Sequence, residues 1–302
     1  MVSSVKCFIF DCDGVIWKGD SVIDGVPETL AALRAAGKRL FFVTNNSTKS
    51  RKGYLKKFQD LGLVDVAAEE IYSSSYAAAA YLQSIQFGQT ASPETAGKKV
   101  YIVGEVGIQE ELDLVGIPHL GGPADADQKI DLKPGFYLPH DTDVGAVVVG
   151  FDRHFNYYKI QYATLCIREN PGCLFIGTNP DAVTHLTDAQ EWAGNGSMVG
   201  AIRGSTKQEP VIVGKPNGFM LDNIAATLGI EKQEICMVGD RLDTDILFGK
   251  ENGTRTMLVL SGVTGVEEAK RAVGGNMEAD LISPSIAPFA AALGGGKVVE
   301  KE

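Results

Sequence analysis

The chain has 302 residues, of which 44% are hydrophobic and 22% are charged, as in globular proteins large enough for two domains. Its formal net charge of −10 argues against a general nucleic-acid binder, because phosphate backbones bind clustered Lys and Arg, but it allows a small phosphorylated ligand. No stretch reaches the roughly 18 apolar residues that span a bilayer, so we expect neither a nucleic acid nor a membrane as a partner.

The first sixty residues alternate strand-like and helix-like segments. Residues 5–10 form a β-branched and aromatic run that predicts a buried parallel strand, and residues 27–36 carry apolar side chains at helical spacing. Residues 39–43 predict a second strand, and residues 50–61 predict a second helix. This alternation predicts an open, Rossmann-like α/β core, which is a doubly wound parallel sheet with helices on both faces.

The polar segment 86–97 predicts a domain junction. Three further strand-and-helix units follow, beginning at residues 99, 144 and 173. The strands that then return to the first domain are expected at residues 211–215, 235–240 and 256–260. We therefore predict a catalytic core of residues 1–96 and 209–302, and an inserted α/β domain of residues 97–208.

The start of the chain and its cysteines bear on the cellular compartment. The sequence begins almost directly on a strand and shows no secretory signal, which predicts a cytosolic protein or the mature form of an organellar one. The five cysteines are scattered and form no CxxC pair, as is typical of a reducing compartment. Cys12 lies inside the first motif described below, where passive packing and a redox role both remain open.

Asp11 and Asp13 lie at the end of the first strand, where both carboxylates can face one pocket. Their repulsion would be relieved by a hard divalent cation such as Mg²⁺. Asp11 could then attack phosphorus to form an acyl phosphate, and Asp13 could protonate the leaving oxygen and later deprotonate water. Gly14 would give a backbone N–H close access to a phosphate oxygen.

Three more strand ends carry polar residues that suit phosphate. The hydroxyl of Thr44 and the N–H groups of Asn45 and Asn46 could cradle a phosphate group, although a turn that caps the next helix is an alternative. Lys215 precedes a proline at an expected helix start, where a cation is unfavourable unless it has a function, and it could bridge the nucleophile and phosphate.

The fourth strand end is acidic. Asp240 follows an apolar strand directly and is a candidate Mg²⁺ ligand. Asp245, a little further along the chain, could orient Lys215 or a metal-bound water from outside the ligand shell.

The segments FDCDGVIW, FFVTNNSTKSR, VGKP and VGDRLDTDI together resemble motifs one to four of the haloacid dehalogenase superfamily, and the resemblance extends over essentially the full chain. It implies a Mg²⁺-dependent phosphatase with Asp11 as nucleophile and Asp13 as general acid and base. It further implies that Asp11, Asp13 (through its carbonyl) and Asp240 bind Mg²⁺. The residues implied to bind phosphate are Thr44, Asn45, Asn46 and Lys215.

The roughly 170 residues between Thr44 and Lys215 resemble the large α/β cap, type C2, of the family that includes 4-nitrophenylphosphatases, pyridoxal phosphatase and eukaryotic phosphoglycolate phosphatases. Residues 22–51, with VLSGVT at residues 259–264, are similar to the algal and plant phosphoglycolate phosphatases. That similarity implies hydrolysis of 2-phosphoglycolate to glycolate and phosphate, in photorespiration. Pyridoxal phosphate, or a broad range of 4-nitrophenyl and sugar phosphates, is the alternative.

The resemblance also implies a specificity loop at residues 178–185, in which His185 is the candidate substrate contact. Arg153, His154 and Arg203 are further cap cations that a substrate carboxylate could meet. A homodimer through the cap is expected, and so is a location in the chloroplast stroma after loss of a transit peptide, with the cytoplasm as alternative. A phosphate sensor, a dehalogenase and a phosphonatase are other functions of such a scaffold, and the presence of Asp13 argues against the first two.

Overall fold

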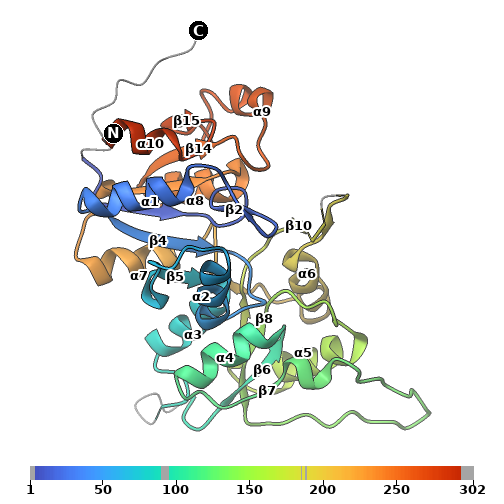
Figure 1. Ribbon diagram of the computed structural model, residues 1–302. Coiled ribbons are helices and arrows are strands. Elements are labelled where there is room, and N and C mark those ends of the chain that lie inside the picture. The colour runs from blue at the N-terminus through green and yellow to red at the C-terminus, as the bar shows by residue number, and fades with distance from the viewer. Residues whose placement is uncertain (1–3, 90–94, 185, 188, 294–302) are drawn as a thin grey trace. The chain divides into compact units, whose positions relative to one another are not determined.

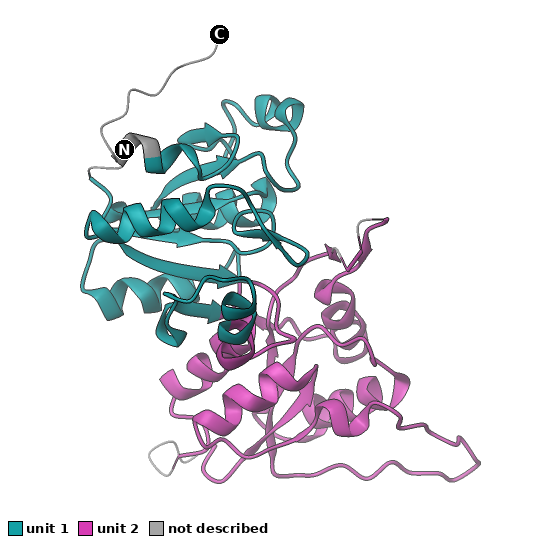
Figure 2. Ribbon diagram, viewed as in Figure 1, with its two compact units in different colours: residues 1–44, 55–72, 215–302 teal, residues 45–54, 73–214 magenta. Residues whose placement is uncertain are grey.

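The computed structural model describes residues 4–89, 95–184, 186–187 and 189–293. It divides into two compact units (Figures 1 and 2). Unit 1 comprises Met1–Thr44, Leu55–Tyr72 and Lys215–Glu302, and unit 2 comprises Asn45–Tyr54 and Ser73–Gly214. Among the described residues, no helix has both the length and the apolar character needed to cross a membrane.

A six-stranded sheet forms the centre of unit 1, in the order β15-β14-β13-β1-β4-β5. Its strands are β1 (Cys7–Phe10), β4 (Arg39–Thr44), β5 (Ile71–Ser73), β13 (Ile235–Gly239), β14 (Arg255–Val259) and β15 (Leu281–Ser283). Neighbours from β15 to β4 are parallel. All four residues of β1 are buried, as expected for a central strand covered on both faces.

Helices cover both faces of this sheet, with α1 and α7 on opposite sides (Figure 1). The helices of unit 1 are α1 (Val26–Ala35), most of α2 (Arg51–Asp60), α7 (Phe219–Leu228), α8 (Leu247–Glu251), α9 (Val266–Arg271) and α10 (Pro288–Leu293). Phe8 of β1 meets Phe289 of α10 edge to face, with ring centroids 5.4 Å apart. A hairpin of β2 (Trp17–Lys18) and β3 (Ser21–Val22) follows β1, and a π-turn at Leu242–Ile246 follows β13.

Unit 2 has a parallel sheet of its own, in the order β12-β9-β8-β6-β7. Its strands are β6 (Lys99–Val103), β7 (His119–Gly121), β8 (Val144–Val149), β9 (Leu174–Gly177) and β12 (Val211–Ile212). Its helices are α3 (Ser74–Ser84), α4 (Val106–Leu114), α5 (Tyr157–Glu169) and α6 (Asn195–Thr206), and β10 (Val183–Thr184) pairs antiparallel with β11 (Trp192–Ala193). The buried core joins α5 and α6 to the sheet through residues such as Val147, Tyr162 and Ile202.

The predicted fold class, a doubly wound parallel α/β core with a second α/β domain, is confirmed. One strand assignment was wrong. Residues 211–215 were expected to return to the first sheet, but β12 covers only two of them and pairs with β9 in unit 2, with Val211 opposite Ile176. Lys215 nevertheless belongs to unit 1.

The limits of the observed units differ from the predicted domain junctions at 96/97 and 208/209. Unit 2 takes in α3, because α3 packs beside α4, and it takes in β12, because β12 extends the sheet of unit 2. It also takes in residues 45–54, of which only 51–54 belong to α2. The boundaries of the two units follow from contacts between helices and strands. The polar segment 86–97, which was predicted to be a domain junction, does not coincide with any boundary of unit 2.

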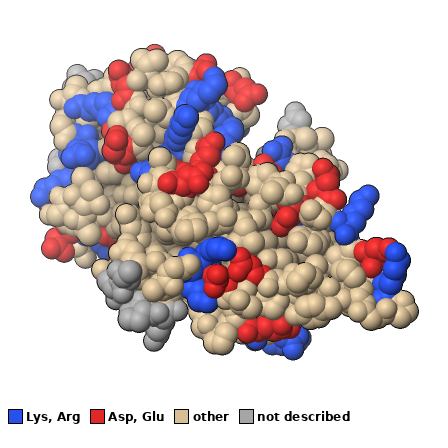
Figure 3. All heavy atoms as spheres, turned by 90° about the horizontal axis from the view of Figure 1, so that it is seen from below, with Lys and Arg blue, Asp and Glu red and all other residues tan. Residues whose placement is uncertain are grey.

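Charged side chains are interspersed on the face drawn in Figure 3, where Lys and Arg lie among Asp and Glu. The described residues on that face form no extended surface of one sign.

Candidate active site

Asp11 follows β1 and is held by the strand beside it. Its backbone N–H donates to the carbonyl of Val238 on β13 at 2.9 Å, and its side chain is only 8% exposed. Oδ1 of Asp11 accepts a hydrogen bond from the ammonium of Lys215, and Oδ2 has no hydrogen-bond partner among the described residues. One carboxylate oxygen of the candidate nucleophile is therefore anchored while the other is available.

Lys215 is a buried cation shared by three oxygens. Besides Asp11, its Nζ donates to Asp245 Oδ1 at 2.7 Å and to the carbonyl of Val43 at 3.2 Å. Burial lowers the pKa of the Lys215 ammonium, but the carboxylates of Asp11 and Asp245 outweigh burial and raise that pKa above its ordinary value. The side chain therefore keeps its positive charge inside the site.

Asp245 uses both of its carboxylate oxygens within the protein. Oδ1 accepts from Lys215, and Oδ2 accepts from the backbone N–H groups of Asp240 at 3.2 Å and Arg241 at 3.1 Å. Asp245 lies in the single π-helical turn Leu242–Ile246, and these two N–H groups bring its side chain back to the end of β13. The contacts suit the predicted orienting role better than a place among the metal ligands.

Three buried carboxylates meet at this point, and the two that are not fully used by the protein, Asp11 and Asp240, fit a hard cation. Ligand oxygens of Asp11, Asp240 and Asp245 all lie within 4.8 Å of one another. Burial first, and then neighbouring carboxylates, raises the pKa of Asp11 well above its ordinary range and that of Asp240 to about 7. A divalent cation would relieve this crowding of negative charge, and carboxylate oxygens are the ligands that Mg²⁺ prefers.

Asp240 is held in turn by the loop after β14. The backbone N–H of Val263 donates to Asp240 Oδ2 at 2.7 Å, and that of Thr264 donates to the Asp240 carbonyl at 3.0 Å. At Gly262 in the same loop, a Cβ atom would lie 1.8 Å from Asp240 Oδ2, so only glycine leaves room for the carboxylate. Reasoning from the sequence did not assign a role to this loop, although a Ser-Gly pair directly after a buried strand was a usable signal.

Gly14 approaches Asp240 from the other side. Its φ of +80° is in the left-handed region that favours glycine, and an added Cβ would lie 2.4 Å from Asp240 Oδ2. The Gly14 N–H was expected to face a phosphate oxygen, but it donates instead to the carbonyl of Trp17 at 2.7 Å. Glycine is therefore needed here for conformation and space, and its N–H is used by the hairpin.

Comparisons with known proteins agree with this arrangement. A model described as haloacid dehalogenase-like hydrolase matches residues 8–118, and a second model, described as HAD-hydrolase-like, matches residues 212–288. Phosphoglycolate phosphatase 1A, chloroplastic, of Arabidopsis thaliana is 64% identical over 294 residues, which cover 96% of this chain and 79% of that protein. The chain belongs to the haloacid dehalogenase-like hydrolases.

Two further relatives extend the comparison beyond plants. Glycerol-3-phosphate phosphatase of Homo sapiens is 39% identical over 290 residues, which cover 94% of this chain and 86% of that protein. The p-nitrophenyl phosphatase from Archaeoglobus fulgidus, a solved structure, has a TM-score of 0.78 at 30% identity, with 95% of this chain and 99% of that chain covered. All three relatives are phosphatases by name.

The three residues predicted to cradle phosphate are consecutive in the chain but belong to different units. Thr44 ends β4 in unit 1 and is buried, whereas Asn45 and Asn46 open unit 2. Asn45 Nδ2 donates to the Asp181 carboxylate at 3.0 and 3.1 Å. Asn46 Oδ1 accepts from the N–H and hydroxyl of Thr48 at 2.9 and 2.7 Å, so the side chain of Asn46 serves the local turn, as in the alternative interpretation.

Cys12 lies between the two motif carboxylates and is fully buried. Burial, and then the charge of Asp11, raises the pKa of the Cys12 thiol well above its ordinary value. Reactive cysteines are thiolates with a lowered pKa, so these surroundings favour passive packing over a redox role in this hydrolase.

The candidate cap cations are placed unevenly. Arg153 donates to both carboxylate oxygens of Glu105 at 2.7 Å, and Arg203 lies 3.5 Å from Glu209. His154 is exposed. His185 lies outside the described residues, so its predicted substrate contact stays a prediction.

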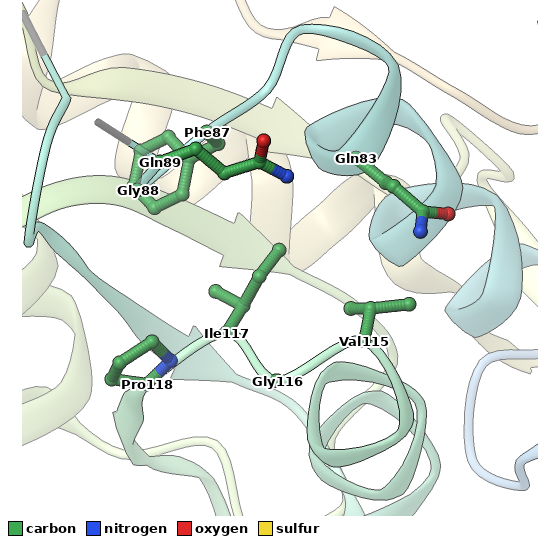
Figure 4. Close-up of a pocket in the computed structure, with 8 residues that line it drawn as sticks. All are labelled: Gln83, Phe87, Gly88, Gln89, Val115, Gly116, Ile117 and Pro118. Atoms are coloured by element: carbon green, nitrogen blue, oxygen red, sulfur yellow. The ribbon is translucent and has the colours of Figure 1, made fainter. Parts of the chain in front are cut away.

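A pocket in unit 2 lies where the chain leaves α3 and α4 (Figure 4). Its lining residues are Gln83, Phe87, Gly88, Gln89, Val115, Gly116, Ile117 and Pro118. No charged side chain is among them, and the pocket belongs to a different unit from Asp11 and Lys215. It therefore lacks the groups that would bind a phosphorylated ligand.

Proposed function

We propose that this hydrolase is a Mg²⁺-dependent phosphatase that converts 2-phosphoglycolate to glycolate and phosphate through an aspartyl phosphate on Asp11. The observation that carries the proposal is the buried contact of Asp11 with Lys215, next to Asp240, in a chain 64% identical to a phosphoglycolate phosphatase. The contact leaves one Asp11 oxygen available and keeps a positive charge beside it.

In the first half-reaction, Asp11 Oδ2 attacks phosphorus. The new bond between oxygen and phosphorus forms as the ester bond breaks, and the leaving oxygen takes a proton from Asp13 and departs as an alcohol. Lys215 balances the charge of the attacking carboxylate and of the phosphate oxygens. Asp245 fixes the ammonium of Lys215 in place by its hydrogen bond of 2.7 Å.

In the second half-reaction, water attacks the phosphorus of the aspartyl phosphate. Asp13, now a carboxylate, takes a proton from that water, and the bond between phosphorus and Asp11 breaks to release phosphate. The proton balance closes, because Asp13 ends the cycle protonated as it began.

The acidic residues of this site would hold the Mg²⁺ ion of the proposed reaction. Asp11, Asp240 and the carbonyl of Asp13 would hold it, and when bound it neutralises charge on the carboxylates and the phosphate group. The N–H of Val263 keeps one Asp240 oxygen turned towards the loop after β14, so the other oxygen is left for the ion.

An Asp11→Asn variant tests the chemistry. An amide cannot form the acyl phosphate, so we expect Mg²⁺-dependent turnover to fall by at least about 10³-fold, while circular dichroism shows an unchanged fold. Retained Mg²⁺-dependent activity would contradict the assignment of the nucleophile.

The identity of the substrate is tested by assaying the wild-type enzyme with about twenty phosphate esters, including 2-phosphoglycolate, pyridoxal phosphate, 4-nitrophenyl phosphate and sugar phosphates. The proposal requires the highest kcat/KM for 2-phosphoglycolate. Similar values across the panel would instead support a broad-specificity phosphatase, the alternative that the names of the relatives also allow.

We also propose that the protein forms a homodimer through the inserted unit. Leu132, Phe136 and Tyr137 are 73%, 49% and 69% exposed on the segment between Asp125 and β8, which has no helix or strand. Apolar side chains gathered on one segment are typical of an interface. Sedimentation velocity should show that the wild type is a dimer and that the double variant Leu132→Glu, Tyr137→Glu is a monomer. A monomeric wild type would refute the proposal.

The proposed location is the chloroplast stroma, with a role in photorespiration, and the cytoplasm is the alternative. The name of the Arabidopsis relative, which includes the word chloroplastic, supports the organelle. Immunoblots of purified stroma and of cytosol should find the protein in the stroma. Its recovery in the cytosol alone would favour the alternative.

A further inference from the structure

Trp17, the first residue of the β2–β3 hairpin, lies beside Asp13 in unit 1. Its indole Nε1–H donates a hydrogen bond to Asp13 Oδ1 at 2.8 Å, and the Trp17 side chain is fully buried. The Asp13 side chain is exposed by contrast, and its Oδ2 has no hydrogen-bond partner among the described residues. One oxygen of this carboxyl group is thus fixed from the protein interior.

The indole ring itself is firmly held. Lys57 Nζ lies 4.4 Å from the ring centroid, and Phe58 meets the ring edge to face at 4.9 Å. The hairpin backbone adds two constraints, since Gly14 N–H donates to the Trp17 carbonyl at 2.7 Å and Trp17 N–H donates to the Cys12 carbonyl at 3.2 Å. The ring nitrogen therefore meets its acceptor in a fixed position.

Packing alone does not account for tryptophan at this position. A buried indole N–H has lost its water and must find an acceptor, and here the acceptor is Asp13 Oδ1. Phenylalanine would pack against Phe58 without needing an acceptor. The indole therefore links a core side chain to a carboxyl group that would otherwise rotate about its own torsions at the surface.

We propose that Trp17 is a positioning residue that orients Asp13 for proton transfer. Because the indole holds Oδ1 as an acceptor, the proton of the carboxylic acid resides on Oδ2, the oxygen that remains for the leaving group. This inference rests on the role proposed above for Asp13 as general acid.

The leaving group decides how much that orientation matters. When the ester bond to phosphorus breaks, its electron pair goes to the leaving oxygen, and the proton on Asp13 Oδ2 passes to that oxygen to give the alcohol. An alkoxide is too strong a base to leave without this proton, whereas 4-nitrophenolate leaves readily without it. A misplaced Asp13 should therefore slow alkyl esters selectively, while general damage to the site should slow both kinds.

The test compares kcat/KM of Trp17→Phe for two esters at saturating Mg²⁺, namely 4-nitrophenyl phosphate and the alkyl phosphate that the wild type hydrolyses best. This ratio reports the steps up to leaving-group departure, before the hydrolysis that both substrates share. We expect kcat/KM to fall by about 10-fold for the alkyl ester and by less than about 2-fold for the aryl ester. The 10-fold loss is a part of the roughly 10²- to 10⁴-fold rate enhancement that a general acid supplies. Phe58→Leu, which disturbs packing against the same ring but keeps its N–H, should affect the two esters equally.

Asp13→Asn separates failure of this inference from failure of the proposed mechanism. If Asp13→Asn slows both esters equally, the role of Asp13 as general acid fails. If it slows the alkyl ester selectively but Trp17→Phe slows both equally, the role of Trp17 is overturned.

An isosteric replacement covers the case in which Trp17→Phe does not fold. The chain has only two tryptophans, so 3-benzothienylalanine can replace Trp17 alone in a Trp192→Phe background. It keeps the ring shape and lacks the N–H, and the same selective loss is expected. An equal loss for both esters would overturn the inference.

Discussion

The buried carboxylates of Asp11, Asp240 and Asp245 lie close together, and the one ammonium beside them, that of Lys215, contacts only Asp11 and Asp245, so unit 1 carries uncompensated negative charge at this point. Burial and the charge of Asp245 raise the pKa of Asp240 from its ordinary value of about 4 to about 7. Between these values the folded metal-free protein binds a proton more tightly than the unfolded chain does. The contribution of Asp240 to stability therefore falls as the pH rises from about 4 to about 7.

Asp240→Asn should stabilise the metal-free protein and inactivate it. The amide removes the charge but can still accept the N–H of Val263, so we expect the free energy of unfolding at pH 7.5 to rise by roughly 2 kcal/mol in EDTA. Excess Mg²⁺ should stabilise the wild type but not the variant, and so reduce or reverse the difference. Thermal unfolding with EDTA and with Mg²⁺ measures both effects.

Asp243→Asn is the matched control, because its carboxylate lies in the same turn but is 63% exposed and pairs with Arg241. We expect this change to shift stability by less than about 1 kcal/mol in either buffer. A wild type that gains no stability from Mg²⁺ would contradict the proposed metal site.

Asp11 and Asp240 could be predicted, because each directly follows a strand of one parallel sheet, and the carboxyl ends of such strands meet at one edge. The structure brings them together with Lys215 and Asp245, which were also predicted. The sheet argument did not apply to Lys215, because the strand before it, β12, pairs with β9 in unit 2. The role of Trp17 was not predicted. Its position after the DxDG motif suggests a core residue, and the sequence does not show that its ring nitrogen faces a carboxylate.

Among the elements, β1, β4 and β13 were predicted within a few residues, since each is an apolar run that is almost entirely buried. Helix α3 was not predicted, because Ala77–Ala80 places apolar residues all round the helix and leaves no stripe to recognise. The sheet to which β12 belongs could not be predicted either, since a two-residue strand carries no information on its neighbour.

The loop after β14 allows a prediction about how one structural element controls the site. In Gly262→Ala, the new methyl group would lie 1.8 Å from Asp240 Oδ2, so the carboxylate or the loop must move. A displacement of about 1 Å in a catalytic group costs roughly 10²-fold in rate, and we expect a loss of that order together with a higher Mg²⁺ requirement. Steady-state rates over a Mg²⁺ titration measure both.

Gly265→Ala is the control for this loop. Gly265 has a φ of −85°, and nothing lies within 4 Å of an added Cβ, so its rate and Mg²⁺ requirement should stay within about 2-fold of wild type. If the two variants behave alike, the close approach of Gly262 to Asp240 does not control the site.

At the scale of the whole molecule, two α/β domains could be predicted because each half of the pattern has enough strand-and-helix units for a core of its own. Each observed unit has its own parallel sheet. The core of unit 2 also contains an ion pair, in which Lys159 Nζ donates to Asp152 Oδ2 at 2.6 Å and the two side chains are 0% and 1% exposed. This pair allows unit 2 to be perturbed while the carboxylates of unit 1 are left unchanged.

Lys159→Met should destabilise unit 2 by about 3–5 kcal/mol, because it leaves Asp152 buried without its cation. Adding Asp152→Asn should restore most of this loss, since a neutral amide can still accept the backbone N–H of His154, which donates to Asp152 Oδ1 at 2.8 Å. Scanning calorimetry of the wild type, the single variant and the double variant, each with EDTA and with Mg²⁺, follows both units in one experiment.

Because large proteins with separate cores need not unfold in one step, the expected result is a transition that Lys159→Met lowers and a second one that responds to Mg²⁺. A single transition that shifts with both changes would mean that the units unfold together. A double variant no more stable than Lys159→Met would mean that the loss comes from the packing of the long Lys159 side chain, and that the unpaired charge of Asp152 contributes little.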